Sequence, residues 1–138
     1  MAPALAAFGD ERLRAVPAYL ATVRRNGTPR VHPVTPVIDD AHMCVFMEPD
    51  SPKAHDLRVR RAYALHNGVT EGGAAGEFAL FGEGTLVDGI EARAAAAAAA
   101  GYEVEPRYLL FELTVLEARS NVFGDLSILP TPRRWSEA

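Results

Sequence analysis

The sequence predicts a mainly β protein in which six or seven mostly antiparallel strands form a small closed or split barrel, with two or three short helices inserted. Three observations carry this prediction. Asn26-Gly27 separates two strand-like runs, the strongest short-range signal of a hairpin. The apolar run 77–87 contains two glycines, which is typical of a bulge or a barrel corner. The chain has 138 residues, 49% hydrophobic and 23% charged, so we expect one globular domain over residues 1–138.

The elements follow in order along the chain. We expect strands at 16–25, 30–38, 43–47, 62–67, 77–87 and 107–118, and a short one around Val122-Phe123. We expect helices at 9–15, 51–61 and 90–100. Short runs of apolar and β-branched residues between turn residues indicate the strands. Asp10, Ser51 and Asp88 are candidate N-caps of the three helices, and Gly101 ends the third, which contains seven consecutive alanines.

The second predicted strand, 30–38, carries Pro33 and Pro36. Proline has no backbone N–H, so a strand with two prolines lies at a sheet edge or bulges. Two interpretations follow. The prolines protect an exposed edge from aggregation, or they leave unpaired backbone groups that bind the rim of a flat heterocycle.

Composition disfavours several classes of function. The net charge of −4 argues against non-specific nucleic-acid binding, which depends on basic residues against phosphates. No apolar run approaches the roughly 20 residues of a membrane-spanning helix, and residues 1–8 lack the basic start of a signal peptide. The single cysteine, Cys44, fits a reducing compartment and is expected to be a buried, inert thiol. We therefore expect a cytoplasmic protein with no membrane or nucleic-acid partner.

The usual catalytic and metal-binding patterns do not occur in the sequence. The histidines are widely spaced, without the helical spacing of a zinc motif, and Cys44 has no cysteine partner. No Gly-x-Ser-x-Gly motif of a serine hydrolase is found. We expect no metal and no hydrolytic machinery. A cofactor that brings its own reactivity would account for a site of this kind.

Lys53 is the residue that most strongly indicates a ligand. Ser51-Pro52 is typical of an N-cap followed by a first helical residue, which puts Lys53 in the first turn. A cation there opposes the helix dipole and gains little from folding. The unpaired N–H groups of that turn and the ammonium could instead bind one phosphate. A solvated surface lysine is the alternative. Arg30 is the second candidate cation.

Taken as a set, these residues resemble a known family. Arg30-Val31-His32-Pro33-Val34, then Ser51-Pro52-Lys53-Ala54-His55-Asp56-Leu57 after a strand ending in Phe46-Met47, is similar to the FMN-binding split barrel of the pyridoxamine 5′-phosphate oxidase family. The strand order and the run 77–84 are similar too, so the likeness covers roughly residues 10 to 120. It implies a homodimer with two FMN sites at the subunit interface. It also implies an oxidoreductase in which flavin N5 passes a hydride to or from a small substrate.

The resemblance implies a role for each matching residue, but assigns no catalytic residue. Arg30 and Lys53 would hold the FMN phosphate, joined by Ser51. Backbone groups of Val31, His32, Pro33, Val34 and Thr35 would line the isoalloxazine ring, which Phe46 and Met47 would flank. Glu77 stands where the oxidases usually carry a glutamine that contacts flavin from the other subunit, and Trp135 matches loosely as a residue that closes the pocket.

Two departures leave alternatives open. The end of the chain, Pro132-Arg133-Arg134-Trp135, lacks the arginine-histidine substrate motif of true pyridoxamine phosphate oxidases, so we do not expect oxidation of vitamin B6 phosphates. The Ala- and Arg-rich composition resembles that of actinobacterial proteins, where relatives of this fold use the deazaflavin F420. An F420-dependent reductase is therefore one alternative. A flavin or haem carrier without turnover is another, with His32, His55 or His66 as the axial haem ligand.

Overall fold

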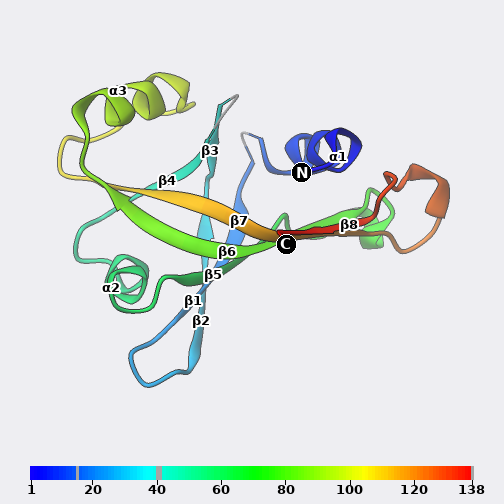
Figure 1. Cartoon of the computed structure of the whole chain (residues 1–138), viewed down its shortest axis with the longest axis horizontal. Coiled ribbons are helices and arrows are strands. Elements are labelled where there is room, and N and C mark those ends of the chain that lie inside the picture. Colours follow the sequence, from blue (N-terminus) through cyan, green and yellow to red (C-terminus); the bar gives the residue numbers. More distant parts are fainter. Residues whose placement is uncertain (15, 40–41, 138) are drawn as a thin grey trace.

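The computed structural model describes residues 1–14, 16–39 and 42–137, which form eight strands and three α-helices (Figure 1). The helices are α1 (Pro3–Leu13), α2 (Pro52–Val59) and α3 (Ile90–Ala99). The strands are β1 (Ala18–Val23), β2 (Pro29–Val34), β3 (Val37–Ile38), β4 (Met43–Met47), β5 (Ala62–His66), β6 (Glu77–Val87), β7 (Leu109–Asn121) and β8 (Arg134–Ser136). None of the described helices is long and apolar enough to cross a membrane.

All eight strands belong to one antiparallel sheet. Its order is β2-β1-β5-β6-β7-β4-β3, and β8 adds to β7 beside this path. The first and last strands of the order, β2 and β3, are separated in the chain only by Thr35 and Pro36. The sheet must therefore curl until its two ends meet, which produces the split barrel that the sequence predicts. The predicted hairpin is confirmed, because β1 and β2 pair through the turn at Asn26-Gly27.

The long pair β6 and β7 forms the middle of the sheet and contains a bulge. Its register shifts between Phe81 and Gly82, where the sequence predicts an irregularity. A Cβ atom added at Gly82 would overlap the carbonyl oxygen of Thr114 on β7. Only glycine therefore fits this close approach of two backbones, and the bulge lets the sheet bend into a barrel.

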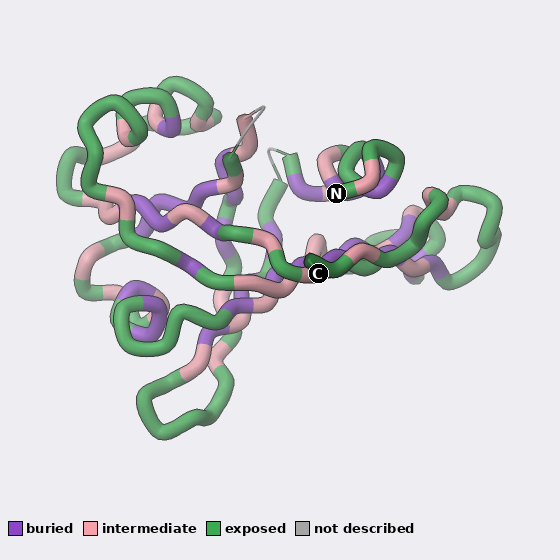
Figure 2. The backbone as a smooth tube through the Cα atoms, viewed as in Figure 1, coloured by how far each residue is buried: buried purple, intermediate pink, exposed green. Residues whose placement is uncertain are grey.

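The core fills the inside of the curled sheet. Its largest fully buried side chains include Leu20, Leu65 and Phe111 from the strands, with Leu5 from α1 and Leu57 from α2. Each of these helices turns one buried stripe toward the sheet and leaves its other side exposed (Figure 2). A second, smaller cluster lies under α3, where Ala96 packs with side chains of β4 and β7. The buried thiol of Cys44 belongs to this cluster.

Two predictions near the N-terminus differ from the structure. Helix α1 begins at Pro3 rather than at residue 9, and Asp10 forms an ion pair with Arg14 instead of capping the helix. Gly9 lies inside the helix because its missing side chain makes room for the ring of Phe78 on β6. The predicted end of this helix at Ala15 and part of the turn at 39–41 lie outside the described residues.

Three further predictions are corrected. The predicted strand 30–38 is two strands, because Thr35 and Pro36 interrupt it. The N-cap of α3 is Gly89 rather than Asp88. The predicted strand around Val122-Phe123 does not form: β7 continues to Asn121, and the strand of the tail is β8. Tertiary pairing with β7 explains the last difference, since the run Arg134–Ser136 carries little strand signal of its own.

Candidate functional site

Six of the predicted site residues line one pocket of about 310 Å³, which we call the Lys53 pocket. They come from three places in the chain: the end of β2 and the break after it, the end of β4, and the first turn of α2. The six are Pro33, Val34, Thr35, Phe46, Met47 and Lys53, and Glu48, Tyr102 and Tyr108 complete the lining. Residues chosen from local patterns in the sequence therefore meet in space.

The first turn of α2 explains why Lys53 faces the pocket unpaired. Ser51 is the N-cap: its side-chain oxygen accepts a hydrogen bond from the N–H of Ala54 at 3.3 Å and donates one to the carbonyl of Glu48 at 2.8 Å. The Ser51 hydroxyl thus already makes two hydrogen bonds to the backbone. Among the described residues, none forms a hydrogen bond or ion pair with the ammonium of Lys53. The Arg107 hydrogen bond lowers the pKa of Glu48, and the charge of Lys53 across the pocket lowers it further by a smaller amount. A cation at a helix N-terminus without a hydrogen-bonded or ion-paired partner fits a bound anion.

Arg30 does not line the Lys53 pocket; a buried carboxylate holds it on β2, where its charge and that of Lys53 both act on His32. The Nε of Arg30 donates to Oδ2 of Asp56 at 2.9 Å, and the hydroxyl of Thr22 donates to the same oxygen at 2.7 Å. Asp56 is 1% exposed, whereas the side chain of Arg30 is 29% exposed. Arg30 makes no other hydrogen bond within the described part of the chain. Asp56 therefore fixes one edge of the guanidinium and leaves its terminal nitrogens available.

The pKa of His32 is affected by burial and by the positive charges near this end of β2. Burial lowers its pKa, and the positive charges of Lys53 and Arg30 lower it further, against the opposite effect of Asp56. Its Nε2 lies 3.4 Å from the hydroxyl of Thr22. His32 does not line the Lys53 pocket. The three basic side chains form one electrostatic group, whose unfavourable mutual interaction a bound anion would relieve.

The segment between α3 and β7 supplies the remaining wall of the pocket. Arg107 binds the carboxylate of Glu48 through two nitrogens, at 2.9 and 2.5 Å. Arg93 of α3 donates to three carbonyls of the segment, including that of Tyr108 at 2.6 Å. These contacts hold Tyr108 at the pocket, where Tyr102 lies near it. Burial, followed by the neighbouring Tyr108, raises the pKa of Tyr102, so its phenol keeps its proton at neutral pH.

The sequence did not indicate Glu48, Tyr102 or Tyr108 as site residues. The tyrosines flank a loop that follows an alanine-rich helix, and they carry no motif. Their place depends on the arginine contacts, which join residues far apart in the chain. One signal was present: Glu48 directly follows the strand that ends in Phe46-Met47.

The other predicted site residues lie outside the Lys53 pocket. Val31 is 64% exposed and points away from the barrel, whereas Ser51 caps α2. Glu77 lies in a separate cleft, where it bonds to His66 at 3.1 Å and to Asn121 at 3.3 Å. Trp135, on β8, packs against the main core. Within one chain, the structure does not bring Glu77 and Trp135 to Lys53.

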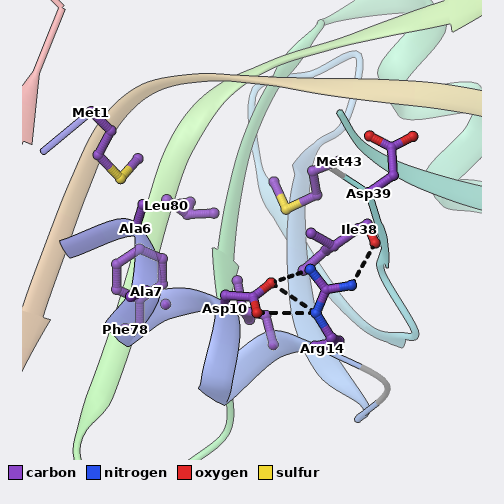
Figure 3. Close-up of a pocket in the computed structure, with 12 residues that line it drawn as sticks. Met1, Ala6, Ala7, Asp10, Arg14, Ile38, Asp39, Met43, Phe78 and Leu80 are labelled. Atoms are coloured by element: carbon purple, nitrogen blue, oxygen red, sulfur yellow. Dashed lines mark hydrogen bonds and ion pairs between the residues drawn. The ribbon is translucent and has the colours of Figure 1, made fainter. Parts of the chain in front are cut away.

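Another cavity, of about 410 Å³, lies between α1 and the mouth of the barrel (Figure 3). Its walls are mostly apolar, with Met1, Met43 and Leu80 among them. The charged residues Asp10 and Arg14 bond to each other, and Arg14 also donates to the carbonyl of Ile38. Because these charges are already paired, this cavity is a weaker candidate for an anionic cofactor than the Lys53 pocket.

Known structures show which fold this arrangement belongs to. A NimC/NimA family protein from Clostridium acetobutylicum is 17% identical, with a TM-score of 0.70 over 88% of this chain and 87% of that one. A haem-binding protein from Mycobacterium smegmatis is 18% identical, with a TM-score of 0.69 over 91% of this chain and 57% of that one. HutZ, the haem storage protein from Vibrio cholerae, is 16% identical, with a TM-score of 0.62 over 85% of this chain and 92% of that one.

The chain has the split-barrel fold. At these identities, the likeness shows the fold alone, and what the neighbours bind is not carried over with it. No protein-family model and no curated protein sequence matches the chain. Two of these neighbours are named for haem binding or haem storage. The choice of cofactor therefore has to be argued from the residues of the site.

Proposed function

We propose that residues 1–138 form one FMN-binding domain of an oxidoreductase related to pyridoxamine 5′-phosphate oxidase. One observation carries the proposal: the unpaired ammonium of Lys53 stands at the N-terminus of α2, in a pocket lined by Pro33, Thr35 and Phe46. Folding gives little reason for a cation in this position, whereas a phosphate gives a strong one.

The phosphate of FMN would interact with Lys53 and with the terminal nitrogens of Arg30. The ion pair with Asp56 supports this role, because it fixes the Arg30 guanidinium before the ligand arrives and lowers the entropy lost on binding. Ser51 would contribute indirectly, as the cap that orients the first turn of α2. The net positive charge around His32 would be neutralised on binding.

The ring system of FMN would lie along the break between β2 and β3. Strand β2 pairs only with β1 among the described strands, so alternate backbone groups from Pro33 to Thr35 can bond to a heterocycle. Phe46 and Met47 supply apolar contact on one side. When bound, FMN supplies the hydride acceptor and donor, which explains a site without a nucleophile or a catalytic dyad. The protonated phenol of Tyr102 can donate a hydrogen bond to a small substrate.

The pocket lies at the lower end of the volume range of small-molecule sites, so we infer that a second subunit completes it. The outer face of β1, β2 and β5 supports a homodimer. Val31 pairs with Ala21, which pairs with Ala64, and all three point away from the buried Leu20 side. Tyr19, 52% exposed, belongs to the same face. An exposed apolar face of this kind is typical of a twofold interface.

In such a dimer, Glu77 and Trp135 of one subunit could reach the Lys53 pocket of the other, as the family resemblance implies. Sedimentation velocity tests the interface. We expect a dimer for the parent protein and a monomer for Ala64→Arg, which puts a charge on the apolar face. A monomeric parent protein would refute the composite site.

Two other cofactors fit less well. F420 presents a phosphate and a flat tricycle, so the same residues would serve it. A haem carrier is suggested by two structural neighbours, a haem-binding and a haem storage protein. No histidine of the described chain lines the Lys53 pocket, and His66 is bonded to Glu77 and to the N–H of Gly68. His55 is exposed on α2 and does not line the pocket either, so the absence of a histidine from the described lining favours flavin at this site.

The oxidoreductase proposal is tested on protein loaded with FMN. Anaerobic addition of a reduced nicotinamide should bleach the visible flavin absorption, and an added electron acceptor should restore it. FMN that stays oxidised with this donor and with dithionite-reduced mediators would mean that the protein carries flavin without turnover.

A further inference from the structure

A second cleft, at the far end of the sheet, is lined by three arginines. It has a volume of about 320 Å³ and is formed by β6, β7 and β8, with the last residue of β5 and the residue before β8. We call it the arginine cleft. Its lining residues are His66, Glu77, Ala79, Phe81, Arg119, Ser120, Asn121, Arg133 and Arg134. This concentration of positive charge stands out in a chain whose net charge is −4.

Two of the arginines lie directly opposite each other on adjacent strands. Arg119 on β7 and Arg134 on β8 are direct partners in the antiparallel pair. Like charges in this position destabilise a sheet. Glu117 offsets part of the repulsion through an ion pair with Arg119 at 2.7 Å, but Arg134 has no hydrogen bond or ion pair within the described residues. Arg119 also lies over the ring of Phe81, 5.4 Å from its centroid, so folding accounts for Arg119 and leaves Arg134 unexplained.

The backbone that carries the third arginine is rigidly held. The N–H and the hydroxyl of Ser120 both donate to the carbonyl of Arg133, each at 2.9 Å, and Ser120 is buried. The side chain of Arg133 makes one hydrogen bond, to the amide oxygen of Asn121 at 3.2 Å. Most of its donors remain available. Arginines presented by fixed backbone lose less entropy when they bind a ligand.

The only carboxylate on the cleft wall is already hydrogen-bonded. His66 accepts the N–H of Gly68 at Nδ1, so its Nε2 carries the proton and donates to Glu77 at 3.1 Å. Asn121 donates to the other oxygen of Glu77 at 3.3 Å. With Glu77 satisfied by these two donors, Arg133 and Arg134 have no carboxylate partner in the cleft.

We propose that the arginine cleft is a binding site for the anionic group, a carboxylate or a phosphate, of a small organic molecule. Arg134 and Arg119 contact the anion from adjacent strands, and Arg133 closes on it from the side. Planar guanidinium groups suit both kinds of anion, because each can donate two parallel hydrogen bonds. The ligand relieves the repulsion between the two opposed arginines. The cleft includes Glu77, which the proposed dimer brings toward the partner's Lys53 pocket. The anion is assigned to Arg119, Arg133 and Arg134 whichever cofactor that pocket binds.

The test is a titration of the full chain at constant ionic strength, followed by NMR signals of the arginine side chains and of His66. Inorganic phosphate is one arm, and succinate, a dicarboxylate, is the other. We expect saturable shifts at Arg119, Arg133 and Arg134. Arg134→Ala should weaken binding about tenfold or more, since it removes charge-assisted hydrogen bonds. The arm that binds more tightly identifies the class of anion.

Arg25→Ala is the matched control, because it removes the same charge from an exposed position at the hairpin end. It should titrate like the parent protein. Phosphate should also raise the melting temperature of the parent more than that of Arg134→Ala, since binding to the folded state stabilises it. Equal titration of the parent, Arg25→Ala and Arg134→Ala, or no saturable shift with either anion, would overturn the proposal.

Lys53→Ala separates this inference from the proposed function. We expect it to bind FMN about 10- to 100-fold more weakly and to keep the anion titration of the arginine cleft. If the parent protein takes up no FMN but shows the cleft titration, the cofactor proposal fails and the anion site stands. If FMN binds and the cleft shows no saturable shift with either anion, the anion site fails and the cofactor proposal stands.

Discussion

Lys53→Ala separates a functional lysine from a structural one. The ammonium has no partner among the described residues, so its removal should change the free energy of unfolding by no more than about 0.5 kcal/mol. The sign should favour greater stability, because the cation opposes the dipole of α2. A charge-assisted hydrogen bond to phosphate contributes about 1.5–3 kcal/mol. The dissociation constant for FMN should therefore rise about 10- to 100-fold.

The assay is a titration with FMN followed by flavin fluorescence, beside urea unfolding of the same variants. Arg58→Ala is the matched control, since Arg58 is an exposed cation in the last turn of the same helix. It should leave FMN affinity unchanged and lower stability slightly, because a cation at a helix C-terminus is favourable. The reasoning is refuted if Lys53→Ala binds FMN like the parent protein, or if it unfolds as readily as a core variant.

Three further predictions concern the fold and its charges. Asp56→Ala should lower the free energy of unfolding, measured in urea, by about 3 kcal/mol, because it leaves the half-buried Arg30 without its carboxylate partner. A loss under about 1 kcal/mol would contradict the structural role of this ion pair. The pKa of His32 is lowered in the folded state, so the stability that His32 contributes is complete above its ordinary pKa of 6.5 and is lost as the pH falls through the folded pKa. Bound FMN should raise the pKa of His32, as measured by NMR. An unchanged pKa would argue against a nearby phosphate. Gly82→Ala should cost at least about 1–3 kcal/mol, because the methyl group would overlap the backbone of β7, whereas Gly101→Ala, where nothing lies within 4 Å, should be nearly neutral.

Local signals in the sequence predicted the parts of the site that depend on local structure. Ser51 and Pro52 have strong preferences at the start of a helix, and they placed Lys53 in the first turn correctly. Pro33 and Pro36 indicated that the strand 30–38 lies at a sheet edge or bulges, and the structure puts β2 and β3 at the two ends of the strand order, although the break between them was not predicted. These effects act within a few residues, so the sequence alone reveals them.

Contacts between distant residues could not be predicted in the same way. Asp56 is the partner of Arg30 only because α2 packs against β1 and brings the two together across 26 residues. The wall that carries Tyr102 depends on the contacts of Arg93 and Arg107 with distant groups. Arg119 and Arg134 are opposed only because of the register in which β7 and β8 pair. Each of these features follows from tertiary packing, which no short-range pattern encodes.

The most direct test of the central claim, that the Lys53 pocket binds FMN, is the visible absorption spectrum of the purified protein as FMN, F420 and haemin are added in turn. We expect tight uptake of one FMN per chain, with shifted flavin bands that appear in Lys53→Ala only at about 10- to 100-fold higher FMN concentration. Selective uptake of F420 would mean that F420 and not FMN is the cofactor, with the same residues binding its phosphate and ring system. A Soret band with haemin alone, or no uptake of any of the three, would contradict the claim.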